Sequence, residues 1–182
     1  MTIKTVLRLG DPRLHQCSDI VNNPGSKEIS SLINDMFDTM NHYQGVGLAA
    51  PQIGMLKRIV IFGFEENKRY PDQAPVPETI LINPEITILD SECESDWEGC
   101  LSIPGMRGRV SRPLRIKYTG ITPQGDKINR QVEGFHARVV QHECDHLDGI
   151  LYVQRIKDMR EFGFIEELDA NQVDHTPPAC ER

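Results

Sequence analysis

Two histidines and a glutamate close to residue 142 have the types and the spacing of a metal-dependent hydrolase. His142, Glu143 and His146 form the pattern H-E-x-x-H. On a helix, positions i and i+4 lie on one face, so both imidazoles can bind one metal ion. Glu143 lies about 100° further round the helix axis, where it can take a proton from a metal-bound water without being a ligand. The pattern therefore predicts a site that produces a nucleophile at neutral pH.

A pair of surface histidines on an amphipathic helix is the alternative interpretation of this pattern. Residues 135–147 have helical periodicity, the apolar stripe of Phe135 and Val139 continues into His142, and Gly149 is expected to end this helix. Buried histidines without a metal would need other partners for their ring nitrogens. A metal site on a partly buried helix is therefore the favoured interpretation.

The third protein ligand has to come from elsewhere in the chain, because catalytic zinc-type sites usually combine three protein ligands with a water. The long metalloprotease pattern H-E-x-x-H-x-x-G-x-x-H fails, since Tyr152 occupies the place of its last histidine. Glu166 has the spacing of a glutamate on a following helix, which thermolysin-like sites use. Glu166 is therefore one open choice for the third ligand.

A cysteine is the other open choice. The five cysteines are odd in number and irregularly spaced, with no C-x-x-C pair, which favours a reducing compartment over a disulfide framework. Cys144 points off the metal face of the helix, Cys17 lies in a polar arm, and Cys180 lies in a polar tail. Cys100, in a glycine-containing loop ahead of the helix, is preferred to Cys93. Spacing alone does not settle the choice between cysteine and glutamate.

Length and composition indicate one soluble globular domain. The 182 residues are 38% hydrophobic and 26% charged, and suffice to bury a core. The net charge of −7 and the pI near 5.4 argue against nucleic acid as the main partner. No apolar run approaches the roughly 20 residues of a membrane span, and the start has no signal-peptide h-region. We predict a cytoplasmic protein with one catalytic domain over residues 1–170 and a flexible tail over residues 171–182.

The elements that must position these residues follow from periodicity and turn signals. A helix is expected over about residues 27–44, with Ser26 as N-cap and Gly45 at the C′ position. Strands are expected over residues 58–64, 79–89 with a break at Pro84, 114–119 and 127–132, the last two joined as a hairpin. A second helical stretch covers residues 156–169, and residues 97–105 are expected to form a loop or strand end. The sum is an α+β fold, with antiparallel or mixed sheets around a central H-E-x-x-H helix, an N-terminal helix and a C-terminal helix.

Small residues dominate the segment 45–52, which reads Gly-Val-Gly-Leu-Ala-Ala-Pro-Gln. The backbone there can approach another object closely. One interpretation is a tight connection between a helix and a strand under a crowded core. The other is a backbone edge that holds a ligand, with Gln52 as an amide donor, and composition alone favours the first.

Three segments together resemble the peptide deformylase family. Residues 45–52 match G-φ-G-x-A-A-x-Q, residues 98–102 match E-G-C-x-S, and residues 141–146 match Q-H-E-x-D-H. The motifs occur in the family's order with similar spacing, so the resemblance spans most of the chain and is highly specific. It implies a hydrolase that removes the formyl group from the N-terminal formyl-methionine of newly made polypeptides and releases formate.

The resemblance also implies roles for the residues of the site. Cys100, His142 and His146 would hold one divalent metal ion per chain, iron(II) in the cell with zinc or nickel as substitutes. Metal-bound hydroxide would attack the formyl carbonyl, with Glu143 as general base and then general acid. The two donors to the developing oxyanion would be the amide of Gln52 and the backbone N–H of Leu101.

The substrate would bind as an added β-strand along the backbone of Gly45, Val46 and Gly47. Its methionine side chain would enter an apolar pocket, whose lining we expect to include Val46, Gly99, Val139 and His142. Arg107 resembles a substrate-contacting arginine, and a solvated surface position is the alternative for it.

Two residues beside the motifs are of unexpected types for positions next to a metal site and an apolar pocket. Arg138 falls beside the pocket, where an aliphatic residue would be usual, and we expect its stem to pack there while its guanidinium reaches water. Cys144, next to Glu143, is expected to be a helix-packing residue that is open to oxidation.

The expected partners are formyl-Met nascent polypeptides. Transient proximity to the ribosome is implied, but the mixed charges of residues 156–169 argue against strong binding to ribosomal RNA. Membrane binding and direct nucleic-acid binding are not expected. The alternative enzyme is an H-E-x-x-H zinc endopeptidase with Glu166 as third ligand. A blue-copper protein also uses two histidines and a cysteine but has no need of the glutamate, and a structural zinc site would need a fourth protein ligand.

Overall fold

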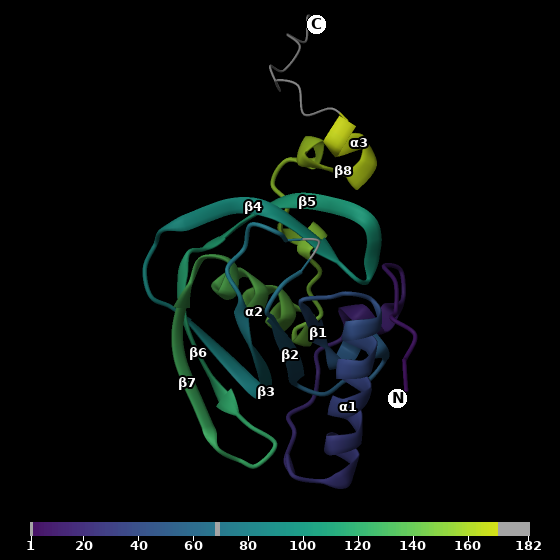
Figure 1. Ribbon diagram of the computed structural model, residues 1–182, viewed down its shortest axis with the longest axis vertical. Coiled ribbons are helices and arrows are strands. Elements are labelled where there is room, and N and C mark those ends of the chain that lie inside the picture. The colour runs from purple at the N-terminus through teal and green to yellow at the C-terminus, as the bar shows by residue number, and fades with distance from the viewer. Residues whose placement is uncertain (1, 68–69, 171–182) are drawn as a thin grey trace, which may run out of the picture.

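The computed structural model describes residues 2–67 and 70–170 (Figure 1). The predicted flexible tail of residues 171–182, with Cys180, lies outside this part of the chain. The helices are α1 (Lys27–His42), α2 (Gly134–Leu147) and α3 (Ile165–Ala170), with 3-10 helices η1 (Pro12–His15), η2 (Ala50–Ile53), η3 (Tyr152–Arg155) and η4 (Met159–Glu161). The strands are β1 (Gly47–Ala49), β2 (Ile59–Phe64), β3 (Val76–Ile88), β4 (Cys93–Cys100), β5 (Ile103–Pro113), β6 (Arg115–Ile121), β7 (Lys127–Glu133) and β8 (Phe162–Phe164).

The described strands form two antiparallel sheets, which confirms the predicted α+β fold. One sheet has the strand order β1-β2-β3-β6-β7, and the other has the order β4-β5-β8. Helix α2 contacts strands of both sheets and lies between them in Figure 1. None of the described helices has both the length and the apolar character that crossing a membrane would require.

The five-stranded sheet is covered by α1 on one face and by α2 on the other. Alternate residues of a strand point to opposite faces, and β2 follows this rule. Val60 and Phe62 belong to the buried cluster that includes α2, whereas Ile59 and Ile61 belong to the cluster that includes α1. All four side chains are fully buried, so the continuous apolar run of β2 reflects burial on both faces.

Helix α1 begins as predicted and ends differently. Ser26 caps its first turn through its hydroxyl. At the other end Gln44, not Gly45, has the positive φ of 54°, and the N–H of Gly45 donates to the carbonyl of Met40 at 2.9 Å. This is a Schellman motif with glutamine in the left-handed position, so the predicted C′ role of Gly45 is wrong. A Cβ at Gly45 would lie 3.0 Å from the Leu101 side chain, which is why a small residue stands there.

Two other predictions about strands are confirmed. The register of β3 shifts between Ile82 and Glu85, next to the expected break at Pro84, where Asn83 has a positive φ of 51°. The hairpin of β6 and β7 pairs continuously from Arg115 to Ile121.

Long-range strand pairing decides two further segments, and the prediction for the second of them is wrong. Residues 97–105 contain the expected strand end, which is the end of β4, followed by a tight turn and the start of the long strand β5, which the sequence did not predict. Residues 156–169, expected as one helix, form η4, β8 and the short helix α3. Residues 162–164 pair with residues 106–108 of β5. Sheet pairing thus overrides both the glycines and prolines of β5 and the helical periodicity of the C-terminal segment.

Candidate metal centre

Three metal-ligating side chains meet where the end of β4 faces α2. Cys100 is the last residue of β4, and His142 and His146 lie one turn apart on α2. One ligand atom from each lies within 4.8 Å of the others, and all three residues are buried. Glu166 is exposed on α3 and is not part of this group. The structure therefore brings Cys100, and not Glu166, to the two histidines.

The turn after β4 places the thiol of Cys100. The strand register shifts between Gly99 and Cys100, so that Cys100 pairs with Ile103 across a two-residue turn. The backbone N–H of Ser102 and the side-chain amide of Gln52 both donate to Sγ of Cys100, each at 3.4 Å. Two such donors favour the thiolate, which is the form of cysteine that binds metals.

The electrostatic surroundings also favour a thiolate. Burial by itself would raise the pKa of the Cys100 thiol. The positive charge of His146, with Nε2 at 3.3 Å from Sγ, and the hydrogen bonds of both histidines outweigh burial and hold this pKa well below its usual range. A thiolate and two imidazoles, buried together, are a donor set that fits iron(II), zinc or nickel.

His142 is oriented by a carboxylate behind it. Its Nδ1 donates to Oε2 of Glu98 at 2.9 Å, which leaves Nε2 available as a ligand atom. The ring also stacks on Tyr152, with ring centroids 6.0 Å apart. Burial by itself would raise the pKa of Glu98, but hydrogen bonds from Arg112 and His142 outweigh burial and hold it well below its usual range. Glu98 is therefore a charged acceptor.

The end of α2 is closed as predicted by Gly149, which has a positive φ of 72°. Its N–H donates to the carbonyl of His146, and the next residue, Ile150, donates to the carbonyl of Asp145. A Cβ at Gly149 would lie 2.6 Å from the backbone of His15. Glycine is thus required both by conformation and by close packing, and the last turn that carries His146 is held in place.

Glu143 is buried at the same centre, and its surroundings suit proton transfer. It is 5% exposed, and its Oε2 has no hydrogen-bond partner among the described residues. Burial raises the pKa of Glu143 to about 7, with the charges of His142 and His146 acting in the opposite direction. A Cβ at Gly47 would lie 2.4 Å from Oε1 of Glu143, so the carboxylate packs directly against the backbone of β1. A carboxyl that titrates near neutral pH can both accept and return a proton.

One cavity collects most of the residues that the sequence singled out. Gly45, Val46, Gly47, Gly99 and Val139 all line it, together with two of the three candidate ligands. Its full lining is Gly45, Val46, Gly47, Gln52, Tyr70, Trp97, Glu98, Gly99, Cys100, Leu101, Phe135, Arg138, Val139, His142 and Glu143. Tyr70, Trp97 and Phe135 line the pocket although no sequence motif predicted them there. Trp97, directly before the E-G-C motif, and Phe135, one turn before Val139, carried a signal, whereas nothing in the loop marks Tyr70.

Gln52 lines the cavity and is 2% exposed. Its Oε1 accepts a hydrogen bond from the backbone N–H of Ala49 at 2.8 Å, which fixes the amide with Nε2 toward the thiol of Cys100 and the hydroxyl of Ser102. A preoriented amide donor beside the candidate metal ligands is thus built into the short helix η2 that follows β1.

Arg107 lies outside this cavity. Its guanidinium lies over the ring of Trp97, 4.8 Å from the centroid, and binds Oδ1 of Asp169 at 2.6 Å. It lines a neighbouring cavity that shares Tyr70, Trp97, Glu98 and Gly99 with the first. Arg107 thus lines the cavity next to the one that contains the candidate metal ligands Cys100 and His142.

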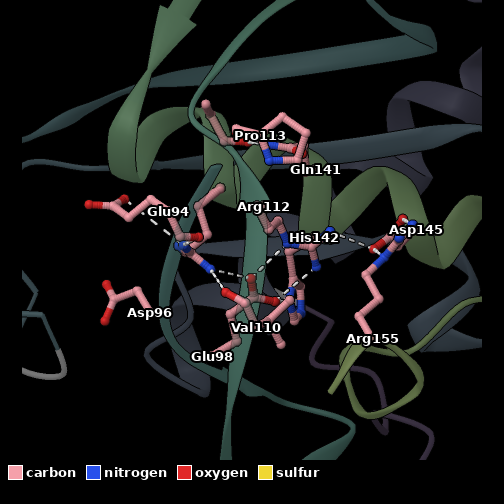
Figure 2. A network of polar contacts seen from close by, with 12 residues as sticks. Glu94, Asp96, Glu98, Val110, Arg112, Pro113, Gln141, His142, Asp145 and Arg155 are labelled. Atoms are coloured by element: carbon pink, nitrogen blue, oxygen red, sulfur yellow. Dashed lines mark hydrogen bonds and ion pairs between the residues drawn. The ribbon is translucent and has the colours of Figure 1, made fainter. Parts of the chain in front are cut away.

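Arg138 lines the cavity, but its guanidinium does not reach water. The side chain is 4% exposed, and Nη1 donates to Oε1 of Glu98 at 2.9 Å. The expected snorkelling of this arginine is therefore wrong. Figure 2 shows the network around Glu98, in which Arg112 binds Glu98 on one side and Asp145 on the other. The buried carboxylate of Glu98 thus keeps the guanidinium of Arg138 in the protein interior.

The other described cysteines are apart from the centre. Cys144 is buried within the core cluster between α2 and the five-stranded sheet, and burial raises the pKa of its thiol. Cys17 and Cys93 are exposed.

The chain matches one known protein family over most of its length. Residues 3–162 match the family model of polypeptide deformylase. Peptide deformylase 1 of Bordetella pertussis is 56% identical over 173 residues, covering 93% of this chain and 98% of the relative. Peptide deformylase 1 of Nitrosomonas europaea is 55% identical over 170 residues, covering 93% and 97% of the two chains.

Solved structures give the same result. The Met-Ala-Ser-bound class I type b peptide deformylase of Acinetobacter baumannii superimposes with a TM-score of 0.82 at 39% identity, covering 85% of this chain and 99% of that one. The peptide deformylase of Thermotoga maritima has a TM-score of 0.76 at 36% identity, covering 87% and 100%.

Proposed function

The chain belongs to the polypeptide deformylase family, whose metal-dependent enzymes remove the formyl group from N-terminal formyl-methionine, and we propose that Cys100, His142, His146 and Glu143 perform this reaction here. The observation that carries the proposal is the meeting of one thiol and two imidazoles within 4.8 Å. Glu143 and Gln52 border the same cavity, so a base and an amide donor are at hand.

The proposed cofactor is one divalent ion per chain, iron(II) in the cell with zinc or nickel as substitutes. Cys100, His142 and His146 would hold it, since three protein ligands leave a position for water. When bound, the ion supplies a water of lowered pKa and Lewis acidity toward the formyl oxygen.

The chain's own residues would handle the proton and the developing charge. Glu143 would accept a proton on its unpaired Oε2 and return it to the nitrogen of the leaving amine. The amide Nε2 of Gln52 and the backbone N–H of Leu101 would donate to the formyl oxygen as negative charge develops on it. Formate and a free amino terminus would result.

The peptide would bind along the small-residue segment that leads into β1. This strand lies at the edge of the five-stranded sheet, where the backbone of Gly45, Val46 and Gly47 can pair with an extended chain. The methionine side chain would enter the cavity beside Val46, Gly99, Val139 and His142. The Met-Ala-Ser peptide bound to the Acinetobacter baumannii relative supports a methionyl peptide as the ligand of this fold. Arg107, in the neighbouring cavity, would contact residues further along the peptide.

The physiological substrates would be nascent polypeptides in the cytoplasm, close to the ribosome. A net charge of −7 disfavours strong binding to ribosomal RNA. The protein would then recognise the emerging amino terminus through the cavity that binds the peptide, and not through docking to ribosomal RNA.

An assay on anaerobically purified, metal-loaded protein tests the proposed function. Formyl-Met-Ala-Ser should release formate, whereas acetyl-Met-Ala-Ser and an unmodified protein should stay intact. Cleavage of internal peptide bonds without formate release would contradict deformylation and favour an endopeptidase.

Replacing Gln52 by alanine should slow turnover more than it weakens substrate binding. The reason is that a donor to the oxyanion acts mainly in the transition state, where losing one such donor costs about 3 to 4 kcal/mol, or 10²- to 10³-fold in kcat. Steady-state kinetics with formyl-Met-Ala-Ser gives both constants. A large rise in KM with an unchanged kcat would assign Gln52 to substrate binding instead.

The stability of the metal-free protein should depend on pH through Glu143. Its pKa is about 7 in the folded protein and 4.5 by its ordinary value, so the folded state binds more protons between these two pH values. Stability is therefore lost as pH rises through this window. Since a difference of one pKa unit corresponds to 1.36 kcal/mol, Glu143→Gln should stabilise the metal-free protein by on the order of 3 kcal/mol at pH 8 and little at pH 4.5.

Denaturant unfolding of both proteins at the two pH values measures this difference. Comparison with the wild type cancels the contributions of the titrating groups that do not interact with Glu143. An equal effect of the substitution at pH 4.5 and pH 8 would show that the Glu143 carboxyl titrates as in an unfolded chain.

A further inference from the structure

We propose that Arg138 is a positioning residue for the metal centre, acting through Glu98 and through the backbones of β4 and β5. It would hold the carboxylate that orients His142, and it would fix α2 against the strand that ends at Cys100. The inference rests on the proposed function in one respect, which is that His142 and Cys100 bind the same ion.

The contacts of the Arg138 guanidinium join three elements. From α2, one turn before His142, Nη1 donates to Oε1 of Glu98 at 2.9 Å and to the carbonyl of Val110 on β5 at 2.8 Å. Nη2 donates to the carbonyl of Glu94 on β4 at 2.8 Å. The histidines lie on α2 and the cysteine at the end of β4. Arg138 therefore links the two elements whose separation sets the distance between thiolate and imidazoles.

Glu98 is the shared point of this linkage. Its Oε1 accepts from Arg138 and from Nε of Arg112 at 2.7 Å, and its Oε2 accepts from His142 and from Nη2 of Arg112, both at 2.9 Å. Figure 2 shows His142 and Arg112 converging on Glu98. Arg138 thus restrains the oxygen that His142 does not use, and the rotation of the carboxylate toward His142 is defined from both sides.

The charged groups around Glu98 are mostly buried. The side chains of Glu98, Arg112 and Arg138 are each 4% exposed, and that of Asp145 is 11% exposed. Asp145 has a further arginine partner, the more exposed Arg155. Loss of Arg138 would therefore act mainly on Glu98, whose buried Oε1 would keep a single arginine donor.

The shape of the guanidinium matters as well as its charge. Its planar fork presents donors in fixed directions, which reach a carboxylate and two carbonyls at once. A lysine at this position would keep the charge but would place it at a single point. Arg138→Lys should therefore recover only part of the effect, while Arg138→Met keeps an apolar stem against the cavity and loses every polar contact.

The competing role for Arg138 is that of a cavity wall, since its side chain also lines the cavity. A wall residue would change KM for formyl-methionyl peptides and leave the metal unaffected. A positioning residue would change metal affinity and the ligand field of the bound ion. These two roles are separated by measurements made without substrate.

The experiment compares Arg138→Met and Arg138→Lys with Arg109→Met, a matched control on β5 whose arginine is exposed and pairs with Glu161. Cobalt(II) is the probe, with affinity measured by chelator competition and geometry by the visible and charge-transfer absorption of the thiolate complex. We expect Arg138→Met to bind cobalt about 10- to 100-fold more weakly, with an altered spectrum and a lower kcat at similar KM. Arg138→Lys should be intermediate, and Arg109→Met should match the wild type.

A double-mutant cycle with Glu98→Gln tests the route of the effect. If Arg138 acts through Glu98, Arg138→Met should weaken cobalt binding far less in the Glu98→Gln protein than in the wild type. Unchanged cobalt affinity and spectrum in Arg138→Met, with only KM raised, would overturn the proposal, as would fully additive effects in the cycle. If Arg138→Met does not fold, Arg138→Lys decides by the same criteria. Failure of the wild type to release formate would refute the proposed function separately, because the cobalt measurements need no substrate.

Discussion

Glu143→Gln lowers the rate of formate release by about 10²- to 10⁴-fold and leaves the metal in place. This is the first of the two largest effects that we expect. The substitution keeps the size and burial of the side chain and removes its ability to carry a proton. Glu143 is not among the three grouped ligand residues, so the metal content should stay near one ion per chain. Its raised pKa of about 7 would suit the carboxyl to both proton transfers of the proposed reaction.

Single-turnover kinetics and metal analysis on the same sample check this result. Glu166→Gln is the matched control, because Glu166 is exposed on α3 and should affect neither measurement. Turnover of Glu143→Gln near the wild-type rate would remove Glu143 as the proton carrier. Loss of metal together with turnover would instead place its carboxylate in the ligand set.

Cys100→Ala abolishes stoichiometric metal binding and, with it, deformylation. The thiolate would be the ligand from β4, and no other described histidine, cysteine, aspartate or glutamate belongs to this group besides the two histidines. With two imidazoles remaining, the ion loses its charged ligand and much of its binding free energy. A ligand that binds only the folded state stabilises it, so added metal should raise the Tm of the wild type and not that of the variant.

Metal content after dialysis against a chelator and thermal unfolding with and without added zinc measure this effect. Cys17→Ala is the control, because Cys17 is an exposed free cysteine. One ion per chain retained in Cys100→Ala would show that another residue completes the site. A folded variant without metal-dependent Tm, as judged by circular dichroism, would support Cys100 as the third ligand.

The local parts of this protein were determined by the sequence itself. The i, i+4 spacing of His142 and His146 specifies one face of a helix whatever surrounds it. The capping serine at residue 26, the apolar run of β2, the break near Pro84 and the left-handed Gly149 likewise depend on neighbours in the chain. Such features follow from backbone geometry over a few residues, and the structure has them where the pattern predicts them.

Only the tertiary structure decided which of the two candidate third ligands lies beside the histidines and which side chains surround Glu98. Cys100 and Glu166 were both compatible with the sequence, and the β4–β5 turn brings one of them to α2 while α3 leaves the other exposed. Arg138 was expected to reach water, and Glu98 holds it inside. The helix expected over residues 156–169 yields to pairing of β8 with β5. These outcomes depend on contacts between segments far apart in the chain, whose free energies no local pattern records.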